Sequence, residues 1–444
     1  MRQWEKIEVN GEQFIFFKNS LCLIKFNSEI ENAFLIAEQG GTIPEEYRMV
    51  VEDVIKQDEM FANFIKNNTG KGGEEEKKLL GIEINTVNAC NMQCQYCFAI
   101  DGTHNKKATM SEDNAKQAID FLFQNAAKRK TLYITIIGGE PLMNIERFKY
   151  IVRYAEEKAA EKQKKVRFFI TTNGTILDED LKAFLDHHQI NIMLSLDSQF
   201  PEIQNLLRPM KNGKGSWEYI RKNFDYFRTR PKSTVHITLT PYNYKLFEYA
   251  KSCYEMGFEC VHFDIVKSDK SEFNFTINQI EEINKECNQL AEYVVNKIEQ
   301  GKAISAYPIM DNIWTLAKRM PKLSSCSVPY HQCCFGPDGK IYPCDVLMWD
   351  KYCMGEIENM TYSPAIFDDL KTPAVCGECW ARYLCGGQCI ADVLQNKESF
   401  QSLYCIFKRN IFKLQLYMFY RLSVSGNYIS EYIKRKEEEY EYEK

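Results

Sequence analysis

The sequence predicts an α/β protein built around a partial (β/α)6 TIM-like barrel, with a small α+β module before it and a cysteine-rich domain after it. From residue 81 onward, apolar β-rich runs alternate with longer amphipathic stretches, which is typical of parallel strands joined by right-handed helical crossovers. Polar motifs follow the ends of these runs, where parallel barrels and doubly wound sheets both gather their chemistry. Ten of the 17 cysteines lie between Cys326 and Cys405, which marks a separate C-terminal region.

Length and composition indicate a globular protein of two or three domains. The chain has 444 residues, with 45% hydrophobic and 26% charged residues. A net charge of −5 gives no reason to expect nucleic acid as a partner. No apolar run approaches the roughly 20 residues of a membrane span, and the N-terminus lacks the order of a signal peptide. We therefore expect a cytoplasmic protein without a membrane partner, in which many cysteines favour metal over disulfides.

The N-terminal module, residues 1–75, combines short strands with helices. Residues 5–26 alternate and then run apolar between turn signals, which predicts two or three strands. Residues 43–66 are expected to form helices, with an apolar face of Val50, Val51, Val54 and Ile55. The polar stretch 67–78 is the expected linker to the barrel.

The barrel, residues 80–305, is read as six strand–helix units, and a flat doubly wound sheet is the alternative. The expected strands are 81–87, 132–137, 167–171, 190–196, 234–240 and 260–266. The expected helices are 111–129, 145–163, 178–188, 216–228, 244–256 and 276–300.

A CxxxCxxC array, formed by Cys90, Cys94 and Cys97, follows the first strand directly. Three thiolates this close can ligate three irons of a cubane 4Fe–4S cluster and leave the fourth iron open to a small molecule. A zinc knuckle is the alternative. Zinc sites more often pair CxxC with a second CxxC or with histidines, and His104 is the only histidine nearby.

The array resembles the signature of the radical S-adenosylmethionine superfamily, in which an aromatic residue, here Tyr96, precedes the last cysteine. The resemblance implies that the open iron binds S-adenosylmethionine, whose reductive cleavage gives a radical that abstracts hydrogen. Further motifs match at the ends of the second and third strands. The cofactor-binding residues implied by these motifs are Tyr96, Phe98, Gly138, Gly139, Glu140, Pro141, Thr172 and Asn173.

In this resemblance Glu140 of the GGEP motif holds the methionine amino group, since a carboxylate beside two glycines can hold an ammonium. Ser195 and Asp197 resemble a segment that meets the ribose, although Ser198 stands where glycine is usual. Arg208 resembles the arginine that pairs with the methionine carboxylate. A solvated surface arginine is the alternative.

The C-terminal cysteines, within residues 320–410, resemble the SPASM domain, which carries two auxiliary iron–sulfur clusters. The resemblance implies an inner 4Fe–4S cluster held by Cys326, Cys344 and Cys389, and an outer one held by Cys376, Cys379, Cys385 and Cys405. Cys333, Cys334 and Cys353 are candidates for a fourth inner ligand, and an open inner site is the alternative. Disulfides or a zinc ribbon are also compatible with the spacing alone. Residues 411–444 are expected to form a helix and a charged tail.

Asp345 follows Cys344 directly. In this position it resembles an aspartate of sulfatase-maturing enzymes that is proposed to take a proton. We expect it to be the catalytic base, with a turn-capping aspartate as the alternative.

These resemblances favour an enzyme with three 4Fe–4S clusters that installs a crosslink, most simply a cysteine thioether, in a ribosomally made precursor peptide. Residues 1–75 resemble a winged-helix element that recognises a leader segment, and a structural cap is the alternative. A flavodoxin or ferredoxin is the implied electron donor. Other readings are a formylglycine-generating sulfatase-maturing enzyme, a carbon–carbon crosslinking enzyme and a non-catalytic electron carrier. The long segment before Cys90 disfavours the sulfatase-maturing reading, and Asp345 favours it.

Overall fold

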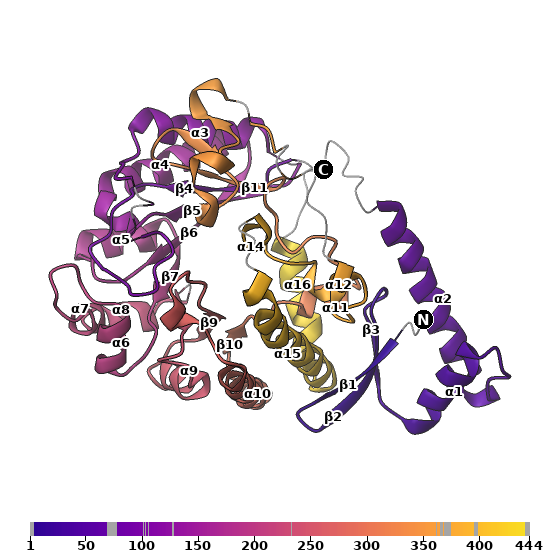
Figure 1. Ribbon diagram of the computed structural model, residues 1–444. Helices are drawn as coiled ribbons and strands as arrows, with labels where there is room; N and C mark the ends of the chain where they lie inside the picture. Colours follow the sequence, from indigo (N-terminus) through magenta and orange to yellow (C-terminus); the bar gives the residue numbers. More distant parts are fainter. Residues whose placement is uncertain are drawn as a thin grey trace.

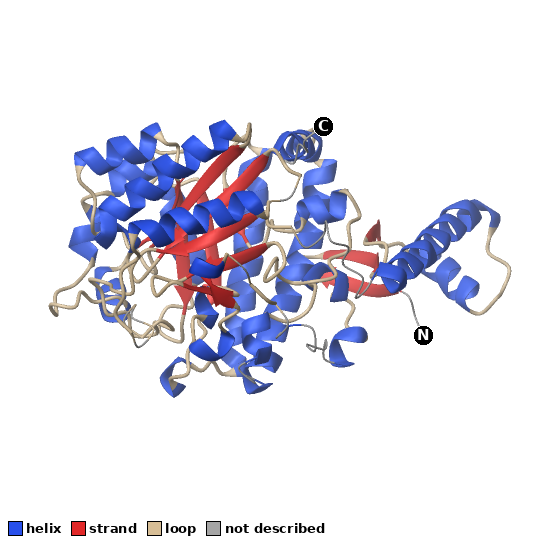
Figure 2. Ribbon diagram, turned by 90° about the horizontal axis from the view of Figure 1, so that it is seen from above, coloured by secondary structure: helices blue, strands red, loops and turns tan. Residues whose placement is uncertain are grey.

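The structure is a computed structural model that describes residues 4–68, 78–100, 102, 104, 106–126, 128–231, 233–360, 362–364, 367, 374–394 and 398–439. A sheet surrounded by helices forms one side of the molecule, and the N-terminal strands and helices project from the other (Figures 1 and 2). Of the expected linker, residues 67–78, the structure describes only residues 67 and 68, which are helical, and Lys78. Among the helices described, none is long and apolar enough to cross a membrane.

Six parallel strands stand side by side in chain order, which confirms the partial barrel. Their pairing runs β4-β5-β6-β7-β8-β9 without a change of direction, whereas a doubly wound sheet reverses at a switch point. The strands are β4 (Gly81–Asn85), β5 (Thr131–Ile137), β6 (Lys165–Thr172), β7 (Asn191–Ser195), β8 (Ser233–Leu239) and β9 (Cys260–Ile265). All six agree with the expected strands within about two residues.

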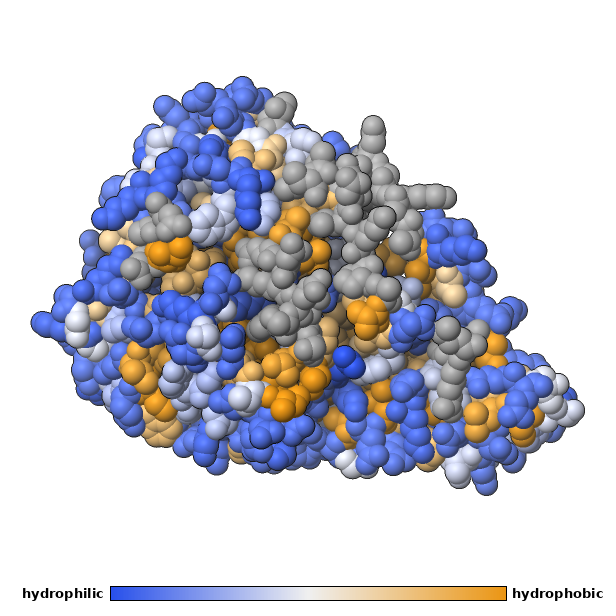
Figure 3. Space-filling view, in the orientation of Figure 1, coloured by the Kyte–Doolittle hydropathy of each residue, from blue (hydrophilic) through white to orange (hydrophobic). Residues whose placement is uncertain are grey.

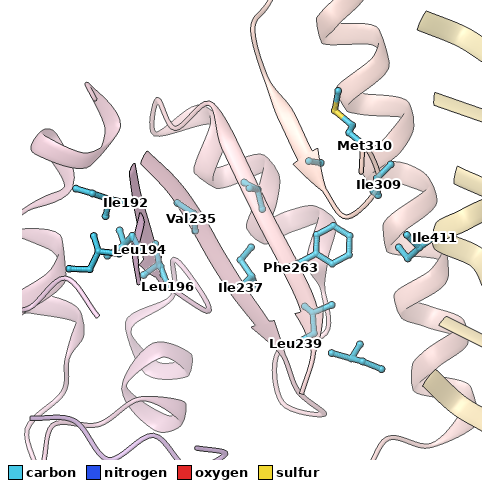
Figure 4. Packing of buried hydrophobic residues seen from close by; sticks show 14 of the residues in the cluster. Ile192, Leu194, Leu196, Val235, Ile237, Leu239, Phe263, Ile309, Met310 and Ile411 are labelled. Atoms are coloured by element: carbon cyan, nitrogen blue, oxygen red, sulfur yellow. The ribbon is translucent and has the colours of Figure 1, made fainter. Parts of the chain in front are cut away.

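Helices cover the outer face of these strands because every second strand residue is apolar and buried. Figure 4 shows this packing for β7, β8 and β9, including Leu194, Ile237 and Phe263. The inner face carries more polar residues and stays partly open. The covering helices are α3 (Glu112–Gln124), α4 (Ile145–Glu161), α5 (Glu179–His187), α6 (Pro201–Leu207), α7 (Trp217–Arg221), α8 (Phe224–Arg228), α9 (Leu246–Glu255) and α10 (Ile277–Glu299). The expected helix 216–228 is therefore two short helices.

The sheet continues beyond the six strands at both edges. At one edge β10 (Ser305–Tyr307) pairs in parallel with β9. At the other edge β11 (Gln332–Phe335) returns from far along the chain to pair in parallel with β4, followed by the antiparallel β12 (Lys340–Tyr342) and β13 (Gly355–Glu356). This pairing brings the C-terminal cysteines beside the first barrel strand.

The N-terminal module is a three-stranded antiparallel sheet with two helices. Its elements are β1 (Trp4–Val9), β2 (Glu12–Phe17), β3 (Cys22–Lys25), α1 (Ser28–Glu38) and α2 (Glu45–Asn68). One face of the sheet packs on α1 and α2, and the other packs on the main body, where the Phe14 ring lies 5.1 Å from that of Tyr420. The sheet is therefore sandwiched, and α1 is an addition to the expected elements. Val51 and Val54 are buried as expected, but Val50 is 43% exposed.

The C-terminal region beyond the sheet contains α11 (Ile313–Ala317), α12 (Ala374–Gly377), α13 (Arg382–Cys385), α14 (Ile390–Leu394), α15 (Glu398–Val424) and α16 (Tyr428–Glu439). Helix α15 lies against α10 and the N-terminal sheet (Figure 1). Buried polar contacts fix it, since Gln415 accepts from Asn312 at 2.6 Å and donates to the Pro308 carbonyl at 2.7 Å.

Hydrophilic residues cover most of the face in Figure 3, and hydrophobic ones gather near its centre. The domain boundaries set out above stay a prediction.

Candidate active site

The cysteine array lies in the loop that leaves β4, and a second loop is hydrogen-bonded along it. The Gln93 amide donates to the Pro209 carbonyl at 2.8 Å, and the Gln95 amide donates to the Leu207 carbonyl at 2.9 Å. These bonds place Arg208 between two anchored carbonyls, beside the array. The arginine-bearing stretch is thus built onto the cysteine loop, and Arg208 is only 8% exposed rather than solvated.

The glycine pair after β5 packs directly against the same cysteine loop. The amides of Gly139 and Glu140 donate to the carbonyls of Val87 and Ala89, each at 2.9 Å. A Cβ atom on Gly139 would lie 2.3 Å from the Ala89 oxygen, and one on Gly138 would lie 2.9 Å from the Val87 oxygen. The glycines are therefore required for close packing of two loops, in addition to any approach to a ligand.

Glu140 is buried, and its carboxylate joins the ends of two strands. It accepts hydrogen bonds from the Asn173 amide at 2.7 Å, the Thr172 hydroxyl at 2.9 Å and the Leu142 amide at 3.1 Å. Burial raises its pKa, and these three donors oppose that shift. Asn173 in turn donates to Asn91 at 2.8 Å, with Cys90 Sγ 3.9 Å from the same nitrogen. One carboxylate therefore fixes the third strand end against the array.

Tyr96, Asp197 and Arg208 form a buried network beneath the array. The Tyr96 hydroxyl donates to Asp197 Oδ2 at 2.5 Å and accepts from Arg208 Nη1 at 2.6 Å. Asp197 Oδ1 accepts from the Thr238 amide at 3.0 Å. Burial raises the pKa of Asp197, and Arg208 opposes that shift. Arg208 Nε is buried and has no acceptor among the described residues, so one donor of the guanidinium is left for a ligand.

A cavity of about 440 Å³ opens in front of this arrangement. Its walls include Cys90, Cys94, Cys97, Tyr96, Phe98, Gly138, Gly139, Glu140, Thr172, Asn173, Ser195 and Arg208. Pro141 and Asp197 do not line this cavity. The residues fit a cluster with S-adenosylmethionine, since three thiols, a free guanidinium donor and a carboxylate meet in one volume.

The C-terminal region and the end of β9 also contribute to the lining of the cavity. Asp345 lines it and begins a 3-10 turn (Asp345–Leu347), with its Oδ1 accepting the Val346 amide at 2.8 Å. Lys267 and Asp392 form an ion pair of 2.8 Å that joins the barrel to α14 across the cavity wall. The sequence reading missed Lys267. Its place directly after the sixth strand was a usable signal, because the other site residues also follow strand ends.

The three cysteines expected to hold the inner cluster lie close together. Cys344 and Cys389 pack on the same small apolar cluster, and Ser325, next to Cys326, donates to the Gln388 carbonyl at 2.7 Å. Cys334 and Cys353 share another apolar cluster with Tyr342 and Met348.

Cys333 points to the opposite face of β11 from Cys334, since side chains alternate along a strand. Its thiol belongs to the main hydrophobic core. Cys333 is therefore the least suited of the three candidates for a fourth inner ligand.

The four cysteines expected to hold the outer cluster also come together. Burial raises the pKa of the Cys405 thiol, and the neighbouring Cys385, Cys376 and Cys379 raise it further, while Arg409 opposes the shift. Cys405 stands on α15, and the other three stand on or beside α12 and α13. Among the described residues, no three cysteine, histidine or carboxylate side chains lie close enough to hold one single metal ion.

Comparison with known proteins gives a family for the barrel. The radical SAM superfamily model matches residues 84–250. An uncharacterized protein of Methanocaldococcus jannaschii is 30% identical over 218 residues, which are 48% of this chain and 71% of that protein. A cysteine-type anaerobic sulfatase-maturating enzyme of Clostridium perfringens is 24% identical over 366 residues, which are 76% of this chain and 96% of that enzyme.

Two solved structures share the fold. Native anSMEcpe with bound AdoMet has a TM-score of 0.64 at 20% identity, covering 78% of this chain and 99% of that one. Streptococcus suis SuiB bound to the precursor peptide SuiA has a TM-score of 0.52 at 14% identity, covering 88% of this chain and 95% of that one.

The chain belongs to the radical SAM superfamily. It is an enzyme with a 4Fe–4S cluster and S-adenosylmethionine as cofactors, related to sulfatase maturases and to radical enzymes that modify ribosomal peptides.

Proposed function

We propose that this enzyme installs a crosslink, a cysteine thioether, in a ribosomally made precursor peptide. The observation that carries the proposal is the cavity of about 440 Å³, whose lining includes both the three array cysteines and Asp345. A substrate residue in this volume meets the cofactor side and the cysteine-rich side together. When bound, the cluster and S-adenosylmethionine supply a radical that abstracts a hydrogen atom.

The residues around the cavity have separate roles in this proposal. Cys90, Cys94 and Cys97 hold the cluster, and the free Nε donor of Arg208 binds the methionine carboxylate. Ser195 lies in the same wall for the ribose. Tyr96 and Asp197 hold Arg208 in place, because their polar atoms pair with each other and the Tyr96 hydroxyl also accepts from Arg208. Tyr96 lines the cavity as well.

Asp345 is proposed as the base that accepts a proton from the substrate. It lines the same cavity as the array cysteines. Its backbone amide donates to Glu83 Oε2 at 3.2 Å, which ties the Asp345 turn to the first barrel strand. The turn-capping contact to Val346 uses only one carboxylate oxygen, so the other stays available.

The N-terminal sheet is proposed to bind the leader segment by strand addition at β3. The Phe26 amide donates to the Gln13 carbonyl at 2.9 Å. The alternation of an antiparallel ladder therefore turns the amides of Leu23 and Lys25 toward the outer edge. No described strand pairs with that edge. The relative whose structure was solved with a precursor peptide matches 88% of this chain.

The C-terminal cysteines are proposed to hold two auxiliary 4Fe–4S clusters, which take up the electron left on the substrate. Cys326, Cys344 and Cys389 hold the inner one, with Cys334 or Cys353 as a fourth ligand. The outer one is held by Cys376, Cys379, Cys385 and Cys405. A flavodoxin or ferredoxin is the proposed electron donor.

The test is an anaerobic reaction of the reconstituted enzyme, S-adenosylmethionine and a reductant with cysteine-rich precursor peptides. Mass spectrometry distinguishes the products. A thioether peptide keeps its sulfur, loses two hydrogen atoms and resists thiol alkylation. Reductive cleavage of S-adenosylmethionine without any change in such peptides would contradict the proposal.

A sulfatase-maturing function is the second candidate, and one observation favours it. The chain aligns with 96% of a Clostridium perfringens sulfatase-maturating enzyme. In that case a sulfatase peptide would lose its cysteine sulfur as formylglycine forms. A carbon–carbon crosslink would also lose two hydrogen atoms, but it would leave the thiols free to alkylate.

A further inference from the structure

Arg382 carries a buried nitrogen that has no hydrogen-bond acceptor. The residue begins α13, the short helix that ends at Cys385. Its Nη2 donates to the Leu323 carbonyl at 3.5 Å, but Nη1 is buried and unpartnered among the described residues. Leaving a buried donor unpaired costs about 1–3 kcal/mol, more for a charged group. An acceptor at this position would remove that cost.

The unpartnered nitrogen lies against the turn between Cys385 and Cys389. A Cβ atom on Gly387 would stand 3.7 Å from Arg382 Nη1. The Gly387 carbonyl accepts from the Cys385 thiol at 2.9 Å, so the guanidinium and this thiol meet at the same residue. The Arg382 backbone is also bonded within this cysteine segment, since its amide donates to the Cys379 carbonyl at 3.1 Å and its carbonyl accepts from the Gly386 amide at 2.9 Å. The guanidinium therefore lies beside the turn that follows Cys385, a cysteine of the outer set.

We propose that Arg382 is a positioning residue of the outer auxiliary cluster, where its Nη1–H donates to a cluster sulfur and raises the cluster's reduction potential. The proposal rests on the assignment of Cys376, Cys379, Cys385 and Cys405 to that cluster. Reduction adds negative charge, and a cationic N–H donor stabilises the reduced form more than the oxidised form. Hydrogen bonds to sulfur and net charge are both established determinants of such potentials. Arginine suits the role because it is always charged and always a donor.

Arg409 provides a matched control for charge alone. It lies on α15, one helical turn after Cys405, and it opposes the burial shift of the Cys405 pKa. Its side chain is exposed, however, so water screens its charge. Arg409→Gln and Arg382→Gln remove the same charge, but only Arg382→Gln removes a buried donor.

The experiment uses the full chain with Cys90, Cys94 and Cys97 changed to alanine, so that only auxiliary clusters give a signal. Anaerobically reconstituted protein should hold about eight irons. Absence of iron in this background would overturn the cluster assignment itself, apart from any role of Arg382. With iron present, the reduced fraction of each cluster is followed by electron paramagnetic resonance at set potentials.

We expect Arg382→Gln to keep its iron and to lower the reduced-to-oxidised ratio of one cluster about tenfold at a fixed potential, a shift of about 59 mV for one electron. Arg409→Gln should change the ratio less than about twofold, because exposed charges act weakly. An unchanged ratio in Arg382→Gln would overturn the proposal. An equal shift in Arg409→Gln would overturn it too, because charge alone would then suffice.

If Arg382→Gln loses the cluster, a second test uses the alanine variant of Cys90, Cys94 and Cys97 that still carries Arg382. Arginine labelled with nitrogen-15 should show a nitrogen coupling to the reduced outer cluster in pulsed measurements. Arg382→Lys keeps a cation and should abolish that coupling. No coupling before the substitution, or a coupling that persists after it, refutes the hydrogen bond.

Discussion

Replacing Tyr96 with phenylalanine tests the buried network that holds Arg208. The change removes one hydroxyl, which donates to Asp197 at 2.5 Å and accepts from Arg208 at 2.6 Å. Both partners are buried, and a hydrogen bond to a charged group contributes about 1.5–3 kcal/mol. Two such bonds give an upper limit of about 3–6 kcal/mol.

The expected loss is smaller, because the charged partners can approach each other. Arg208 Nη1 already lies 3.8 Å from Asp197 Oδ2. We therefore expect Tyr96→Phe to lower the free energy of unfolding by about 2–3 kcal/mol, since a direct ion pair recovers part of the loss. For a barrel of this size that corresponds to a Tm about 4–12 °C lower. Calorimetry and far-ultraviolet circular dichroism under anaerobic conditions measure this change.

Tyr226→Phe is the matched control. Its hydroxyl donates at 2.9 Å to Asp186, which is exposed to solvent. Water can replace this partner, so we expect a loss of about 1 kcal/mol or less. Equal Tm changes in the two variants would refute the stabilising role of the network. Removing the buried Tyr96 hydroxyl would then destabilise the protein no more than removing the exposed Tyr226 hydroxyl.

Three further outcomes follow from the site and the N-terminal sheet. Changing Cys90, Cys94 and Cys97 together to alanine should remove about four of about 12 irons and abolish S-adenosylmethionine cleavage; zinc in place of iron after anaerobic purification would contradict the cluster. Leu23→Pro removes an outward amide of β3, a change that an edge strand tolerates, so peptide modification should fall more than tenfold while cofactor cleavage persists. Leu23→Ala keeps the amide and should leave peptide modification within about twofold of the unchanged enzyme. Equal modification rates in the two variants would exclude strand addition. Asp345→Asn should slow product formation about 100-fold or more while cleavage without product continues, the size expected for loss of a general base, and normal turnover would remove Asp345 from the mechanism.

The sheet packing changes how the N-terminal module must be tested. Deletion of residues 1–75 would uncover the face of the sheet that packs on the main body, including Phe14 and Phe16, which are fully buried. A truncated enzyme would then fail for reasons of stability rather than recognition. The Leu23 pair of variants avoids this because it changes one edge amide.

The sequence alone determined the barrel and the position of each motif at a strand end. Strands and helices follow from local periodicity, which reports the apolar face of each element. The order β4 to β9 then follows because consecutive strand–helix units pack side by side with one handedness. The array cysteines and Glu140 could be found in this way, since each follows a strand directly.

Only the tertiary structure decided which distant segments meet. The pairing of β11 with β4 brings Asp345 into the cavity, across more than half the chain. The sequence also could not show that the Asp197 carboxylate is paired with the Tyr96 hydroxyl. Periodicity reports that a face is buried, but not what covers it. The covering partner is set by long-range packing, which leaves no local pattern in the chain.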